Sequence, residues 1–157
     1  ALSPARVREV YIDDETKELI EGPITEHSIF NSRGQLGHTD YTDAERAALP
    51  SVRHPLVRIH PGSKRKTLYM GSHASHIIGW PMPEGRLLLR ELTEHATQKQ
   101  YVHAHHWQVG DLVIWDNRCT LHRGARYDDA NYRRDLRRVT TQDMDSVNDN
   151  PGLVAAS

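Results

Sequence analysis

The sequence predicts a mainly β domain with flanking helices, in which short antiparallel strands form a sandwich or barrel. Short β-prone runs separated by turn signals follow the first 50 residues. One strong helix interrupts them from Pro83 to about Gln98, because proline suits the first helical turn and the leucines after it share one face. We therefore expect residues 1–50 to be helices and loops that cover the barrel, residues 51–142 to hold the strands, and residues 143–157 to be a flexible tail.

Two shorter helices are expected before the strands. Apolar residues between Pro4 and Gly22 recur at loosely helical spacing, and this segment ends at a Gly-Pro pair. Thr42 and Glu45 have the spacing of a capping box, which predicts a short helix to about Leu49. Residues 24–40 lose this periodicity and read as a loop.

The predicted strands are short and close together in sequence. The runs Pro55 to His60 and Arg65 to Gly71 flank a Pro-Gly-Ser turn and predict a hairpin. A second turn is expected at Val109-Gly110-Asp111. The remaining expected strands are residues 101–107, 112–115, 119–122 and 135–141.

Composition narrows the classes of function. Lys and Arg number 20 against 21 Asp and Glu, so no global positive charge favours nucleic acid or an anionic membrane. No apolar run is long enough to span a bilayer. Cys119 is the single cysteine, which excludes an intramolecular disulfide and favours a reducing compartment, the cytoplasm. The 11 histidines point weakly to metal or acid-base chemistry.

The densest cluster of informative residues runs from Trp115 to Thr140. Because side chains alternate along a strand, Arg134 and Arg138 share one strand face, and His122 can face them across a barrel. A guanidinium matches a carboxylate in a two-point contact, and neutral imidazole is a common iron ligand. This pattern favours a metal ligand beside a pocket for small organic acids. A surface histidine and a solvated arginine face remain the alternative interpretation.

The same cluster resembles a known family. Trp-Asp-Asn-Arg-x-Thr-x-His at 115–122, followed by a double-arginine strand that ends in Arg-Val-Thr, is similar to the C-terminal half of the Fe(II)/2-oxoglutarate dioxygenases of the taurine/2,4-dichlorophenoxyacetate type. Segments within 26–37, 55–58 and 71–76 resemble the phenoxyalkanoate-degrading branch more than taurine dioxygenase. The resemblance extends from about Ile24 to Thr141.

The resemblance implies a double-stranded β-helix, the jelly roll of cupin-like proteins, that is incomplete at its N-terminus. In such enzymes two histidines and one carboxylate hold Fe(II), and 2-oxoglutarate and O2 take the open positions. Mapped by motif, His122 would be the distal metal ligand, Arg134 would bind the C5 carboxylate of 2-oxoglutarate, and Arg138 would bind the substrate acid. The substrate would be a small anion, phenoxyalkanoate-like or sulfonate-like. Trp115, Asp116 and Asn117 are expected to fix the turn before His122.

The family's other two ligands form a His-x-Asp pair on an early barrel strand. The only such pair in this sequence is His38-Thr39-Asp40, which falls in the predicted loop between two helical segments. We interpret it as a coincidence and expect the chain to begin downstream of the family's pair. By this interpretation the chain alone binds Fe(II) weakly and turns over no 2-oxoglutarate. Its hydrophobic content of 37% is also low for a self-sufficient domain.

Several alternatives stay open at this point. His73 and His76 are candidates for the substrate entrance, although solvated loop positions would explain them equally. Histidines at 103, 105 and 106 suggest a zinc hydrolase as another possibility, but strand alternation lets at most two of their side chains point to the same face. A non-catalytic, cupin-like binding module is the main alternative. Nucleic-acid binding by the arginine run is the weakest of these alternatives. Whether the protein forms a homo-oligomer is left open.

Overall fold

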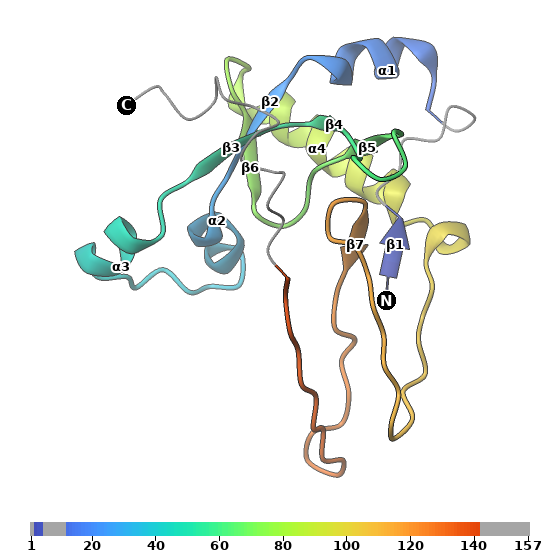
Figure 1. Ribbon diagram of the computed structural model, residues 1–157. Helices are drawn as coiled ribbons and strands as arrows, with labels where there is room; N and C mark the ends of the chain where they lie inside the picture. Colours follow the sequence, from blue (N-terminus) through green and yellow to red (C-terminus); the bar gives the residue numbers. More distant parts are fainter. Residues whose placement is uncertain (1, 5–11, 142–157) are drawn as a thin grey trace. The chain divides into compact units, whose positions relative to one another are not determined.

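The structure is a computed structural model that describes residues 2–4 and 12–141. The chain divides into two units, Ala1–Arg123 and Gly124–Ser157. All of the helices and strands found in the described residues lie in the first unit (Figure 1). In chain order they are β1 (Leu2–Pro4), α1 (Asp14–Glu21), β2 (Ile24–His27), α2 (Ile29–Gly34), α3 (Asp43–Ala48), β3 (Val52–Pro55), β4 (Val57–Ile59), β5 (Lys66–Leu68), β6 (Ala74–Ile77), α4 (Met82–Ala96), the 3-10 turn η1 (Lys99–Tyr101) and β7 (Thr120–His122).

The strands form three small antiparallel sheets. The largest has the order β3-β2-β6, in which Thr25 of the central strand lies opposite His54 on one side and Ile77 on the other. Strands β4 and β5 form the predicted hairpin, and β1 pairs with β7 so that Leu2 lies opposite His122. These sheets do not close into a barrel within the described residues.

The helices begin where local signals place them. Asp13 caps α1 by accepting a hydrogen bond from the Thr16 N–H at 2.7 Å, whereas residues 5–11 of the predicted first helix lie outside the described residues. The capping box of α3 is confirmed: the Glu45 N–H donates to Thr42 Oγ1 at 3.2 Å, and the Thr42 N–H donates back to the Glu45 carboxylate at 2.9 Å. Helix α4 spans most of its predicted range and ends at Ala96.

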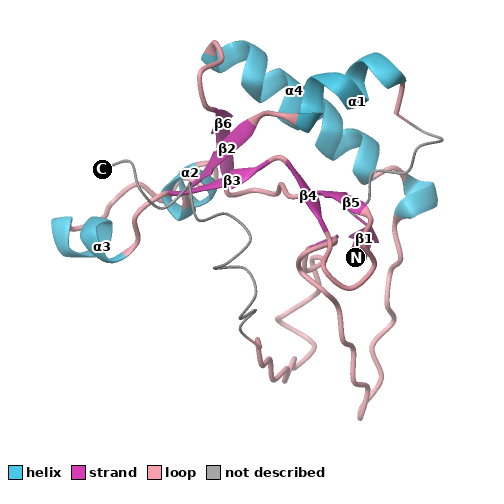
Figure 2. Cartoon of the chain, turned by 45° about the horizontal axis from the view of Figure 1, so that its top comes forward, coloured by secondary structure: helices cyan, strands magenta, loops and turns pink. Residues whose placement is uncertain are grey.

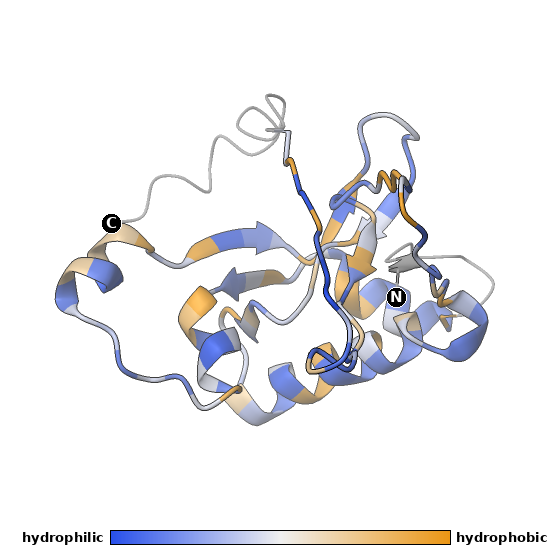
Figure 3. Ribbon diagram, turned by 90° about the horizontal axis from the view of Figure 1, so that it is seen from below, coloured by the Kyte–Doolittle hydropathy of each residue, from blue (hydrophilic) through white to orange (hydrophobic). Residues whose placement is uncertain are grey.

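The core lies between α4 and the strands. Buried side chains from α1, the β4–β5 hairpin, β6 and α4 make one cluster, and α4 packs directly on β6. A Cβ at Gly85 would lie 3.3 Å from both the backbone nitrogen and the Cβ of Ile77, so glycine permits this close approach. Hydrophilic and hydrophobic residues mix along α4, as expected for a helix with one buried face (Figure 3).

Three predicted strands are wrong. Residues 112–115 and 135–141 have no strand structure, and residues 101–107 contain only a single bridge residue, so these segments appear as loop (Figure 2). A strand needs a neighbour for its backbone N–H and C=O groups, and the described residues supply none at these places. Leu112 and Ile114 alternate as a strand should but are 83% and 85% exposed.

Strands β1, β2, β3 and β6 and helix α2 were not predicted from the sequence, and β2 matters most for the fold. Residues 24–27, expected as loop, form β2 and become the central strand of the largest sheet. The segment Ile-Thr-Glu-His carries little apolar signal, yet Thr25 is fully buried between two partner strands.

Among the described residues, no helix is both long and apolar enough to cross a membrane. The expected tail at 143–157 lies outside the described residues.

Candidate functional site

The turn that leads into β7 is organised by Asp116. The Arg118 guanidinium donates to the Asp116 carboxylate at 2.8 and 3.0 Å, and the Arg118 N–H donates to it at 2.9 Å. The Asp116 carbonyl accepts hydrogen bonds from the Cys119 N–H at 3.2 Å and from Thr120 Oγ1 at 2.5 Å. The motif before His122 therefore folds as a tight turn, which hydrogen bonds to both the side chain and the backbone carbonyl of Asp116 hold closed.

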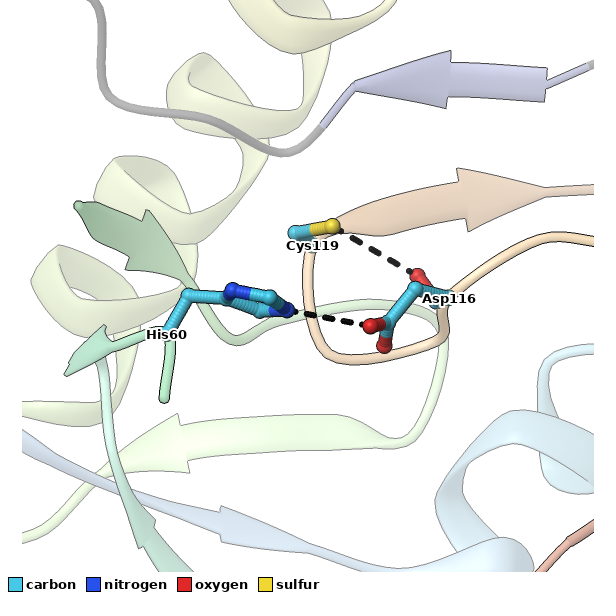
Figure 4. A group of neighbouring side chains, drawn as sticks. All are labelled: His60, Asp116 and Cys119. Atoms are coloured by element: carbon cyan, nitrogen blue, oxygen red, sulfur yellow. Dashed lines mark hydrogen bonds and ion pairs between the residues drawn. The ribbon is translucent and has the colours of Figure 1, made fainter. Parts of the chain in front are cut away.

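His60 reaches this turn from the β4–β5 hairpin (Figure 4). Its Nε2 lies 3.0 Å from the Asp116 carboxylate, and its Nδ1 accepts a hydrogen bond from the Ser63 N–H at 3.0 Å. Because Nδ1 is the acceptor, the proton of the neutral ring sits on Nε2 and is donated to Asp116. The hydrogen bonds from Arg118 and then His60 hold the pKa of the Asp116 carboxyl far below its usual range.

His60, Asp116 and Cys119 form the one group of three ligand-bearing side chains that lies close together within the described residues. Their ligand atoms are within 4.8 Å of one another. The carboxylate is, however, already paired with the Arg118 guanidinium, and the His60 nitrogen that faces it carries a proton. Cys119 is buried, with its Sγ 3.8 Å from the Asp116 carbonyl oxygen. These contacts favour a hydrogen-bonded brace over a metal site.

His122 lies at the end of β7 and is exposed. Its ring centroid is 5.0 Å from that of Trp115, and the Trp115 indole N–H donates to the Asn117 side-chain oxygen at 2.8 Å. The contacts of Trp115, Asp116 and Asn117 are thus those of residues that shape the turn before His122. Within the described residues, His122 belongs to no close group of three ligand-bearing side chains.

His38 and Asp40 lie in the connection between α2 and α3, and both are exposed. The His38 ring packs edge-on against Tyr41 at a centroid distance of 4.9 Å. In the part of the chain that the structure describes, neither residue joins a close group of three potential metal ligands. The interpretation of the His-x-Asp pair as a coincidence stays a prediction.

Arg134 and Arg138 belong to the second unit, where both are exposed and residues 132–141 are extended loop. The Arg134 guanidinium lies 5.6 Å from the centre of the Tyr127 ring, a cation–π distance. The predicted convergence of both arginines with His122 stays a prediction.

The two entrance candidates have hydrogen-bonding partners of their own. His73 is exposed, and its Nδ1 lies 2.8 Å from Ser32 Oγ. Because the Ser32 hydroxyl donates to the Ile29 carbonyl at 2.8 Å, His73 is the donor in this pair. His76 is half-buried on β6, with Nδ1 2.9 Å from Ser75 Oγ. Their role at a substrate entrance stays a prediction.

The histidines near residue 105 form no close group of three potential ligands within the described residues. His105 Nε2 lies 2.8 Å from the Asp111 carboxylate, which also accepts a hydrogen bond from the Gln108 N–H at 2.8 Å. The expected turn is confirmed, with Gly110 at a φ of +93°. These contacts brace a loop, so nothing in the geometry favours the zinc hydrolase alternative.

A cluster of rings that the sequence reading missed lies on strands β2, β3 and the residue after β5. The His27 ring is 5.3 Å from His54 and 5.6 Å from Tyr69, and the Arg58 guanidinium lies 4.6 Å from the Tyr69 centroid. Burial lowers the pKa of His27 most, the neighbouring His54, His73 and Arg58 lower it further, and together they bring it to about 4. Only the pairing of the strands brings these rings together, so no local sequence motif predicts the cluster.

The His27 pKa predicts a pH dependence of stability. The unfolded ring titrates near 6.5, so between pH 6.5 and 4 the unfolded state binds more protons than the folded state. Stability should therefore fall on acidification across this window, by about 1–2 kcal/mol after discounting for partial exposure of the ring. Urea unfolding at pH 7 and pH 4.5 measures the loss. It should shrink in His27→Gln and persist in His106→Ala, an exposed histidine; equal losses in all three would contradict the assignment.

Comparison with known proteins places these observations in a family. The family profile "Taurine catabolism dioxygenase TauD, TfdA family" matches residues 10–140. The alpha-ketoglutarate-dependent 2,4-dichlorophenoxyacetate dioxygenase of Cupriavidus pinatubonensis is 60% identical over 124 residues, which are 79% of this chain and 43% of that protein. The (S)-phenoxypropionate/alpha-ketoglutarate-dioxygenase of Delftia acidovorans is 36% identical over 122 residues, 74% of this chain and 42% of that protein.

Solved structures agree. The crystal structure of AAD-2 in complex with Mn(II) and N-oxalylglycine superimposes with a TM-score of 0.79 at 50% identity, covering 85% of this chain and 53% of that one. The chain thus spans less than half the length of these two curated relatives. Alpha-ketoglutarate, in the names of these relatives, is another name for 2-oxoglutarate.

Proposed function

Because the chain belongs to the taurine catabolism dioxygenase TauD, TfdA family, we propose that it carries the cosubstrate-binding part of an Fe(II)- and 2-oxoglutarate-dependent dioxygenase built on a double-stranded β-helix. One observation carries the proposal: the family match runs through residue 140 and so covers His122, Arg134 and Arg138. Relatives named as phenoxyalkanoate dioxygenases support a small anionic substrate, phenoxyalkanoate-like or sulfonate-like.

His122 fits one position of a metal site. Its imidazole lies at the exposed end of a strand, where a ring nitrogen can bind a metal ion, and the Trp115 ring beside it limits its orientation. Within the described residues, it belongs to no close group of three ligand-bearing side chains. When bound, Fe(II) with O2 supplies the oxidising chemistry that accompanies the decarboxylation of 2-oxoglutarate to succinate.

The two arginines select and orient acids. The planar guanidinium of Arg134 would hold the C5 carboxylate of 2-oxoglutarate through two parallel hydrogen bonds, which fix the orientation of the cosubstrate as well as its position. Arg138, four residues further along the chain, would hold the acid group of the substrate. Holding both acids leaves the reacting carbon in a defined place, which is the contribution that positioning makes to rate.

The experiment is a chimaera in which this chain replaces the matching residues of the Cupriavidus pinatubonensis dioxygenase, to which it is 60% identical. We expect the chimaera to form succinate from 2-oxoglutarate with Fe(II), ascorbate and a phenoxyalkanoate, and the isolated chain to form none. A folded chimaera without turnover would favour the alternative, a cupin-like binding module. Turnover by the isolated chain that disappears in His38→Ala would show that His38 is a ligand after all.

Arg138→Ala in the chimaera is expected to raise the KM for the phenoxyalkanoate about tenfold or more, because an ionised acid loses its charged partner. The affinity for 2-oxoglutarate should change much less. Arg137→Ala is the matched control, since it removes the same charge from the neighbouring residue, to which the family resemblance assigns no bound acid. The same KM increase in both variants would contradict a specific role for Arg138.

Localisation and assembly remain predictions of the sequence. A single, buried cysteine suits a reducing compartment, so we propose the cytoplasm. The balanced charge argues against a nucleic-acid partner.

A further inference from the structure

We propose that His60 is a positioning residue that fixes His122 through Asp116, an inference that rests on the proposed metal-binding role of His122. The two histidines lie on different strand pairs, yet a continuous set of contacts joins them. It starts at the His60 ring, passes through the Asp116 turn and ends at β7. Figure 4 shows its first part.

His60 is held rigidly at the start of the turn between β4 and β5. Its side chain is 12% exposed, its N–H donates to the Arg65 carbonyl at 2.8 Å, and its carbonyl accepts from the Lys64 N–H at 2.8 Å. The Ser63 N–H holds Nδ1 at 3.0 Å. These contacts fix the orientation of the ring so that its Nε2–H points at Asp116. The hydrogen bond therefore holds the Asp116 carboxylate in a defined position.

Asp116 transmits this anchor to β7 by its backbone. The Asp116 carboxylate accepts a hydrogen bond from the His60 ring, and the Asp116 carbonyl accepts one from the Thr120 hydroxyl. Thr120 is the first residue of β7. Trp115, immediately before Asp116, places its ring 5.0 Å from the His122 ring. Displacing Asp116 therefore moves Thr120 and Trp115, two of the residues that help to position His122.

Arg118 does not replace His60 in this role. Its contacts with Asp116 are local, two residues apart, and they close the turn without attaching it to another part of the unit. His60 lies 56 residues from Asp116 in sequence and supplies such an attachment. Thr67 of β5 adds a second one by donating to the Arg118 carbonyl at 3.2 Å. Loss of His60 should therefore loosen the turn without unfolding it.

The test uses the chain itself, labelled with ¹⁵N in its histidines. In the unaltered chain we expect His60 to be protonated on Nε2 and not on Nδ1, and the Trp115 and His122 rings to show a nuclear Overhauser contact. His60→Ala should abolish the ring contact in the chain and, in the chimaera, where the remaining ligands complete the site, weaken Mn(II) affinity at least tenfold, since residues that orient a metal ligand typically contribute that much. His60→Gln, whose amide can still donate to Asp116, should restore much of both.

The matched control is His106→Ala, which removes an exposed histidine and should change neither readout. An Nδ1-protonated His60 in the unaltered chain, or a ring contact that survives in His60→Ala, would overturn the proposal. Failure of the proposed function is distinguishable: Mn(II) would then leave His122 sharp in the unaltered chain, while the ring contact would still report whether His60 positions it.

Discussion

Replacing Arg134 by alanine in the chimaera is expected to weaken 2-oxoglutarate binding at least 30-fold. Truncating one partner of a buried charged pair typically costs about 2–5 kcal/mol, and 2 kcal/mol corresponds to about 30-fold in affinity. The loss arises because the C5 carboxylate gives up its hydration to enter the site and then finds no donor. Calorimetric titration of 2-oxoglutarate into the Mn(II)-loaded chimaera without O2 measures it.

Arg133→Ala is the control that separates a specific contact from bulk charge. It removes the same charge from the neighbouring position, to which the family resemblance assigns no bound carboxylate. We expect a change of no more than a few-fold. Equal losses in the two variants would show that the arginine run attracts the dianion only by its overall charge.

His122→Ala in the chimaera is expected to reduce Mn(II) affinity more than 100-fold. Removing a residue that only orients a ligand typically costs 10–100-fold, and His122 is proposed to be a ligand itself. Electron paramagnetic resonance of free Mn(II) measures the affinity. His106→Ala should bind as the unaltered chimaera does. Unchanged Mn(II) affinity in His122→Ala would remove this residue from the proposed metal site.

Local signals were enough for much of the fold. The capping box of Thr42 and Glu45, the proline at the start of α4 and the Pro-Gly-Ser turn each act within a few residues, and each forms as predicted. Strands at 112–115 and 135–141 failed because a strand depends on a partner that sequence alternation does not supply. Strand β2 was missed for the converse reason, since its partners on both sides make a strand of a weakly apolar segment.

The candidate site divides in the same way. His122, Arg134 and Arg138 could be proposed from the sequence because their motif is contiguous. The contact of His60 with Asp116 crosses 56 residues, and the ring contact of His27 with His54 depends on the register of β2 against β3. No local pattern predicts either contact, because both result from the pairing of segments that are distant in the chain.

The central claim is that this chain supplies one metal ligand, and that this ligand is His122. Titration of Mn(II) into the isolated chain with ¹⁵N-labelled histidines tests it directly, since paramagnetic broadening detects even weak binding at a single residue. We expect the His122 ring resonances to broaden first, while those of His38 and His60 stay sharp. Broadening centred on His38, or on His60 beside Cys119, with His122 unaffected, would contradict the account.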